Sequence, residues 1–261
     1  MKEEAVLCAQ RICLKTCVFR HFVFGGIILN ATTQFILICL AVVCGLLLVA
    51  WLFERFLCKD RLRLSSPKYI TTVAVSAALA GVLMLLEVPL LFLAPSFYKV
   101  DLSELPVLIC TFYLGPVAGV LTEFLKILIK LIFKPSTTAF VGELANFAVG
   151  CALVLPASII YHCKRTKTTA VVGLAAGTGI MTVFGSLFNA VYLLPAFAEM
   201  FHMPLDAIVE MGTEINSGIT GVGTFVLLAV APLNLLKGLA VSLLTMLLYK
   251  RVQPVMFKRQ A

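Results

Sequence analysis

An asparagine and a lysine lie three residues apart in the last long apolar stretch of the chain. They are Asn234 and Lys237, within Ala231-Pro-Leu-Asn-Leu-Leu-Lys-Gly238, and residues at this spacing share one face of a helix. An ammonium inside a membrane helix is costly without a partner, so such a lysine indicates a functional site. The basic end at Lys250 is about 18 Å away along a helix, too far for Lys237 to snorkel there. A structural alternative requires the helix to begin near Gly223, which would bring Lys237 within reach of the opposite interface.

Two further asparagines lie in other apolar stretches and suggest what this chemistry is for. Asn189 lies six residues before Pro195, deep enough that its amide needs a partner, and Asn146 lies near the start of its stretch. Each asparagine offers two hydrogen-bond donors and an acceptor. Three amides and one ammonium suit a neutral, planar heterocycle better than a simple ion. We predict that the helices bearing Asn146, Asn189 and Asn234 converge on a pocket open to the outside.

The carboxylates in the apolar stretches do not indicate catalysis. Glu123 and Lys126 are three residues apart and are interpreted as a structural ion pair. Glu143 opens another apolar stretch, where a helix cap and a ligand contact are both possible. The sequence has no phosphate-binding loop, zinc-protease motif or nucleophile elbow, and no nucleophile or metal partner at a suitable spacing for an intramembrane enzyme using Glu123 or Glu143. We predict a transport or binding protein with no catalytic residue, cofactor or metal.

The composition places these residues in a membrane. Hydrophobic residues make up 61% of the 261 residues and charged residues only 13%, and the mean hydropathy is +1.05. A soluble domain of this length carries about twice the charge. We therefore predict an all-α polytopic membrane protein, and we interpret the net charge of +8 loop by loop as a guide to topology.

Six apolar runs are long enough to cross about 30 Å of hydrocarbon. One run of 29 residues, 105–133, contains Gly115-Pro116, a pair that breaks a helix, so we divide it into a short span and a longer one. The predicted spans are 35–53, 69–94, 105–115, 116–133, 142–161, 170–195 and 224–249.

Basic residues orient these spans. Lysine and arginine gather in 55–68, in 164–167 and at the C-terminus, whereas the loop 196–223 is acidic, so the C-terminus is predicted to be cytoplasmic. The span 35–53 would leave a basic tail outside, unless residues 22–29 form a re-entrant or interfacial segment that keeps the tail inside. The predicted organisation is an N-terminal tail and additional span (1–54), a basic cytoplasmic linker (55–68), a six-helix core (69–252) and a cytoplasmic tail (253–261).

Several runs of the core together resemble one family in order and spacing, over roughly residues 68–252. The family is the riboflavin-specific substrate-binding (S) components of energy-coupling factor (ECF) transporters, the RibU family. The runs that carry the resemblance are Lys99-Val-Asp-Leu-Ser-Glu-Leu-Pro106, Leu114-Gly-Pro-Val-Ala-Gly119 with Glu123-Phe-Leu-Lys126, Gly142-Glu-Leu-Ala-Asn-Phe147, Phe188-Asn-Ala-Val-Tyr-Leu-Leu-Pro195 and Ala231-Pro-Leu-Asn-Leu-Leu-Lys-Gly238.

The resemblance implies a fold and a set of partners. The fold is a six-helix S-component core in the bacterial plasma membrane, with both core termini inside and a vitamin site facing outward; the additional N-terminal transmembrane helix departs from it. The implied ligand is riboflavin, transported rather than used as a cofactor. The implied partners are a transmembrane coupling subunit and two ATPase subunits. An S component for another vitamin or a flavin analogue remains the alternative, because S components share architecture more than chemistry.

The resemblance also implies roles for individual residues. The implied substrate contacts are Asn189, Asn234 and Lys237, together with Asn146, Lys99 and Asp101. Small residues in Ala74-Val-Ser-Ala-Ala78 would otherwise be read as ordinary helix packing. In this family Ala74 and Ala78 would instead form the face that docks on the coupling subunit.

Overall fold

The computed structural model describes residues 31–57, 66–95, 98–136, 140–201 and 203–257. The chain divides into two units, 1–41 and 42–261, which are described separately. Of the first unit the structure describes residues 31–41, which are helical; the predicted re-entrant segment 22–29 lies outside the described residues. The helices and strands from α3 onward lie in the second unit.

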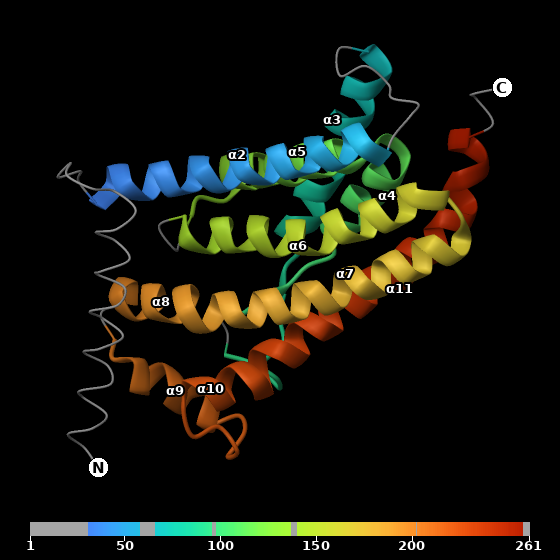
Figure 1. Cartoon of the computed structure of the whole chain (residues 1–261). Coiled ribbons are helices and arrows are strands. Elements are labelled where there is room, and N and C mark those ends of the chain that lie inside the picture. The colour runs from blue at the N-terminus through green and yellow to red at the C-terminus, as the bar shows by residue number, and fades with distance from the viewer. Residues whose placement is uncertain (1–30, 58–65, 96–97, 137–139, 202, 258–261) are drawn as a thin grey trace. The chain divides into compact units, whose positions relative to one another are not determined.

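Nearly all described residues are helical, as Figure 1 shows. The α-helices are α2 (Ala31–Leu57), α3 (Pro67–Leu85), α4 (Glu104–Leu114), α5 (Pro116–Phe133), α6 (Val141–Lys164), α7 (Lys167–Phe188), α8 (Leu194–Phe201), α9 (Leu205–Thr213), α10 (Val222–Phe225) and α11 (Ala231–Phe257). Two π-helical segments, η1 (Asn189–Leu193) and η2 (Val226–Val230), and two short strands, β1 (Val88–Pro89) and β2 (Lys99–Val100), complete the described elements.

The lengths and apolar character of these helices confirm an all-α polytopic membrane protein. Five stretches are long and apolar enough to span a bilayer: Leu37–Phe56, Pro67–Leu85, Val141–Lys164, Lys167–Ala198 and Val222–Tyr249. Helix α4 is apolar but short, and α5 carries three charged residues, Glu123, Lys126 and Lys130. The total of seven spans therefore stays a prediction.

The predicted break between α4 and α5 lies at Gly115. This glycine has a φ of 124°, a backbone conformation that residues with a Cβ rarely adopt, and Pro116 begins the next helix. The Glu54 carboxylate, from the end of α2, accepts a hydrogen bond of 3.0 Å from the Val117 amide. A buried carboxylate at a helix N-terminus satisfies a free N–H and complements the helix dipole. The C-terminal end of α2, which belongs to the second unit, is thus attached to the core at this turn.

The first core span is shorter than predicted. Residues 69–94 were expected to form one helix, but α3 ends at Leu85 and the following residues form an antiparallel pair of short strands. Pro89 lacks an N–H and restricts Val88 to extended conformations, which explains why the helix stops before them. In the pairing Pro89 faces Lys99, so the hairpin brings the segment containing Lys99 back to the end of α3.

Two long helices each contain a π-helical segment just before a proline. Helix α7 continues through η1 into α8 with Pro195 following η1, and α10 continues through η2 into α11 with Pro232 following η2. A proline cannot donate to the carbonyl four residues earlier, which falls inside the π-helical segment in both cases. The two segments contact each other, and α7 and α11 lie side by side (Figure 1). Such π-bulges occur frequently at functional sites.

Packing within the second unit leaves large apolar side chains on the surface of the protein. Val42–Leu57 of α2 packs through the fully buried Ala50 against Met84 of α3, Val117 of α5 and Phe147 of α6. Large apolar residues on α3, α7 and α11 remain exposed, among them Leu79, Val82, Val183, Leu187, Leu239 and Leu243. These surfaces suit a lipid environment.

Candidate ligand-binding pocket

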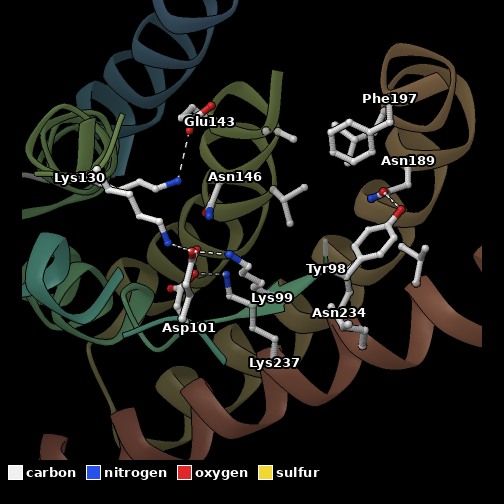
Figure 2. Close-up of a pocket in the computed structure, with 18 of the residues that line it drawn as sticks. Tyr98, Lys99, Asp101, Lys130, Glu143, Asn146, Asn189, Phe197, Asn234 and Lys237 are labelled. Carbon is white, nitrogen blue, oxygen red and sulfur yellow. Dashed lines mark hydrogen bonds and ion pairs between the residues drawn. The ribbon is translucent and has the colours of Figure 1, made fainter. Parts of the chain in front are cut away.

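The six side chains predicted to contact substrate line one pocket (Figure 2). They come from the loop around β2, from α6, from η1 and from α11, and they are Lys99, Asp101, Asn146, Asn189, Asn234 and Lys237. The free space is about 1060 Å³ when the open mouth is included. The cavity volume comparable with that of other binding sites is about 180 Å³, below the about 300–1,000 Å³ typical of sites for drug-sized ligands.

Asn189 is held by its own protein partners. The Tyr98 hydroxyl donates to Asn189 Oδ1 over 2.7 Å, and Asn189 Nδ2 donates to the Gly185 carbonyl over 2.8 Å (Figure 2). Burial raises the pKa of the Tyr98 hydroxyl above its usual range, so this group stays a neutral donor. Both ends of the Asn189 amide are therefore oriented before a ligand arrives.

The other two asparagines each have a polar atom without a hydrogen-bond partner among the described residues. These atoms are the buried Asn146 Oδ1 and Asn234 Nδ2. A Cβ on Gly185 would lie 2.8 Å from Asn234 Nδ2, so the glycine gives this amide the space it occupies. Buried polar groups are normally hydrogen-bonded, and an exception calls for an explanation. Both residues line the pocket, where a bound ligand would supply the missing partners.

Lys237 is paired rather than isolated. Its ammonium lies 2.9 Å from Glu104 Oε1 and 3.4 Å from Asp101 Oδ2. Burial opposes ionisation of Asp101, but the ammoniums of Lys237 and Lys126 and hydrogen bonds from Ser103 hold its pKa well below its usual range. Lys237 therefore neither snorkels to an interface nor stands uncompensated, and it still lines the pocket.

Two separate sets of ion pairs lie among the residues that line the pocket. Glu87 pairs with Lys99 over 2.8 Å and also with Lys134, while Lys130 pairs with Glu143 over 3.2 Å. Burial opposes ionisation of Glu87, but its two lysine partners lower its pKa below the usual value. Glu143 forms this ion pair in the pocket wall, and its role as a helix cap or a ligand contact stays a prediction.

Several pocket residues were not predicted from the sequence. Apolar and aromatic side chains form part of the lining: Tyr98, Ala145, Val149, Leu193, Phe197, Val230 and Leu233. Glu87, Lys130 and Lys134 are further charged residues of the lining. Tyr98 is adjacent to the predicted Lys99, but an aromatic residue in a loop carries no signal of its own.

The predicted ion pair between Glu123 and Lys126 is confirmed, with the two charges 2.7 Å apart. It belongs to a larger set, because Lys126 also lies 3.3 Å from Glu104 Oε1 and donates to Ser103 Oγ over 2.9 Å. Since Glu104 also pairs with Lys237, the groups form one connected set. We call it the buried charge cluster: Asp101, Glu104, Glu123, Lys126 and Lys237.

The small residues of α3 divide between two faces. Ala77 and Gly81 are buried, with Gly81 facing Ile129 of α5, whereas Ala74 and Ala78 are exposed. The inner pair serves packing within the chain. The outer pair is free for contact with lipid or another protein.

Comparison with known proteins identifies the family. The family model described as "ECF transporter, substrate-specific component" matches residues 68–249. The chain belongs to this family. It is therefore a transport protein of the membrane and not an enzyme.

Related proteins and a solved structure agree with this assignment. The chain is 32% identical over 194 residues to a riboflavin transporter, RibU, of Staphylococcus aureus, an alignment covering 74% of this chain and 95% of that protein. It is 29% identical over 188 residues to the riboflavin transporter FmnP of Bacillus subtilis, covering 72% and 93%. A solved S component of a bacterial ECF transporter superposes with a TM-score of 0.57 at 31% identity, covering 73% of this chain and 98% of that one. The S-component fold is thereby confirmed.

Proposed function

We propose that this ECF component captures riboflavin from outside the cell in the pocket described above. The observation that carries the proposal is a pair of amide atoms in the pocket, Asn146 Oδ1 and Asn234 Nδ2, for which the described residues provide no hydrogen-bond partner. The names of the relatives from Staphylococcus aureus and Bacillus subtilis, both riboflavin transporters, support the same ligand.

The chemistry of riboflavin complements these atoms. The pyrimidine-like edge of a flavin presents a carbonyl, an N–H and a second carbonyl, that is, acceptor, donor, acceptor. Asn234 Nδ2 and the Lys237 ammonium are donors for the carbonyls, and Asn146 Oδ1 is an acceptor for the N–H. Asn189, held by Tyr98, adds a further amide at the pocket wall.

The rest of the pocket suits the remaining parts of the ligand. The apolar wall, with Leu193, Phe197 and Leu233, packs against the flat ring system. The polar loop with Lys99 and Asp101 offers hydrogen bonds to the hydroxyls of the ribityl chain.

Purification and titration test this proposal. The protein in detergent should be yellow with a flavin absorption spectrum, and mass spectrometry should identify riboflavin as the bound molecule. Riboflavin added to ligand-free protein should lose its fluorescence on binding, and Lys237→Ala should weaken the affinity at least about tenfold. Saturating riboflavin without any quenching or spectral change would refute the proposal.

We further propose that the exposed Ala74 and Ala78 face of α3 docks on the transmembrane coupling subunit, which works with two ATPase subunits. Small residues allow close approach of a partner helix, and these two lie outside the packing of this chain. Ala74→Arg or Ala78→Arg should abolish uptake of radiolabelled riboflavin by cells while leaving riboflavin binding by the purified protein intact. Normal uptake by both variants would exclude this face.

We propose that the core, 69–252, lies in the bacterial plasma membrane with its pocket outward and its C-terminal tail, 253–261, in the cytoplasm. The basic linker 55–68 would lie on the same side as this tail, and residues 1–54 would add a further span. The charge pattern supports this orientation. A reporter fused to the C-terminus that is active only in the cytoplasm tests it.

A further inference from the structure

The buried charge cluster lies directly behind the pocket. Asp101 and Lys237 line the pocket, whereas Glu104, Glu123 and Lys126 lie outside its lining. The last three have at most 1% of their side chains exposed. These three residues therefore affect the position of a bound ligand through their contacts with Lys237 or Asp101.

One oxygen atom connects the two halves of the cluster. Glu104 Oε1 lies 2.9 Å from the Lys237 ammonium and 3.3 Å from the Lys126 ammonium. Lys126 holds Glu104 from the other side, and it is itself anchored by Glu123 at 2.7 Å and by Ser103 Oγ at 2.9 Å. Glu104 is thus fixed at the first turn of α4 by a residue from α5, and it faces a residue from α11.

These contacts determine the direction of the Lys237 donors. A lysine ammonium has three N–H donors and no acceptor. Asp101 Oδ2 accepts a hydrogen bond from one of them and Glu104 Oε1 forms an ion pair with the ammonium, and no other acceptor contacts Lys237 in the described part of the chain. The third donor remains for the pocket, which Lys237 lines. A flexible side chain with one strong and one longer contact owes its orientation mainly to the strong one, Glu104.

We propose that Glu104 is a positioning residue for ligand binding, which acts by holding the Lys237 ammonium so that its free N–H points at the ligand. The inference rests on the proposed function, since riboflavin is the ligand used to test it. Lys126 supports the arrangement from behind by holding Glu104. Pre-organisation of this kind raises affinity because the side chain is already ordered before the ligand binds.

A double-mutant cycle tests the proposal. Riboflavin affinity is measured by fluorescence quenching for the wild type, Glu104→Gln, Lys237→Met and the double variant. Glu104→Gln should weaken binding about tenfold in the wild-type background and less than about twofold when Lys237 is already Met. Equal losses in both backgrounds, or no loss in either, would overturn the proposal.

Glu54→Gln is the matched control. It is the same substitution at a carboxylate that is also buried, with 6% exposure, but Glu54 contacts Val117 rather than the buried charge cluster. Its affinity for riboflavin should equal that of the wild type. If Glu104→Gln does not fold, Glu104→Asp keeps the charge while shortening the reach, and it should show the same dependence on Lys237.

A ligand-independent measurement separates this inference from the proposed function. In protein labelled with ¹⁵N-lysine, a buried and held ammonium gives a slowly exchanging NMR signal, assigned to Lys237 by its absence in Lys237→Met. The signal should persist in Glu54→Gln and be lost in Glu104→Gln. Its persistence in Glu104→Gln would refute the positioning role, whereas a wild type that binds no riboflavin would refute only the proposed function.

Discussion

Two polar regions lie within the apolar interior of this protein, and they differ in how completely the chain satisfies them. The buried charge cluster holds three carboxylates and two ammoniums joined by ion pairs, and Lys126 by itself contacts both Glu104 and Glu123. The Glu123 oxygens are compensated by this charge, although neither has a hydrogen-bond partner among the described residues. The amides of Asn146 and Asn234, in contrast, each leave one buried atom without a hydrogen-bond partner among the described residues.

This difference in partners distinguishes buried charges behind the pocket, which stabilise the fold, from amides that are available to a ligand. A buried charge requires partners in the folded protein itself, because the free-energy cost of removing it from water is present whether or not a ligand is bound. An amide costs much less to bury, so the protein can leave it partly unsatisfied until a ligand arrives. We therefore expect the loss of Lys126, a cluster member outside the pocket lining, to reduce mainly stability, and substitutions of the amides to reduce mainly affinity.

The largest effect should follow the loss of Lys126. Lys126→Met removes the cation that Glu104 and Glu123 share, and breaking a fully buried pair costs about 3–5 kcal/mol of stability. Chemical unfolding in detergent, followed by circular dichroism, measures the change. A variant as stable as the wild type would show that the cluster is not structural.

Asn234→Ala should mainly affect binding. It removes a donor that has no partner among the described residues, so the folded protein should lose little, whereas riboflavin affinity should fall at least about tenfold. Fluorescence titration together with the thermal unfolding midpoint checks both parts. A large drop in the unfolding midpoint without a change in riboflavin affinity would show that Asn234 stabilises the fold and does not bind the ligand.

A smaller effect should follow a substitution that never touches the ligand. The Cβ of Gly185→Ala would lie 2.8 Å from Asn234 Nδ2 and displace that amide, so we expect riboflavin to bind several-fold more weakly. The matched control is Gly179→Ala on the same helix, where a Cβ meets nothing within 4 Å. Equal affinities of the two variants would show that the Asn234 position is not critical.

The smallest effect concerns pH. The pKa of Asp101 is lower in the folded state than the ordinary value of about 3.9, so the stability it contributes is fully present above that value and is lost as the pH falls through and below it. The stability difference between wild type and Asp101→Asn should be constant between about pH 8 and pH 5 and shrink below about pH 4. Unfolding by urea at several pH values measures it, and a difference that shrinks already near pH 6 would contradict this assignment.

Much of the site could be predicted because polar residues in apolar spans are conspicuous. Asn146, Asn189, Asn234 and Lys237 stand out against their neighbours, and the helix break at Gly115-Pro116 follows from backbone chemistry alone. The assignment of ligand roles to these residues remains a prediction.

Other features depend on contacts between distant segments and left no pattern in the sequence. Glu104, at the start of a helix, is indistinguishable from an ordinary first-turn carboxylate until Lys126 and Lys237 are placed beside it. The hydrogen bond between Tyr98 and Asn189 joins residues 91 positions apart.

The early end of α3 is a different case, because the sequence does contain a signal for it, Pro89. The apolar residues beyond Pro89 concealed that signal.

The π-helical segments have a consequence for how this pocket can change over evolution. Each residue advances an α-helix by about 100°, so a single insertion rotates one half of a helix relative to the other. The segment η2 separates Phe225 from Asn234. The half of the helix before η2 packs with α9, and the half after it bears Asn234 and Lys237. The rotation of each half about the helix axis is therefore fixed by its own contacts. A one-residue deletion within Val226–Val230 would turn one half against the other and misalign the pocket without altering any residue that touches the ligand.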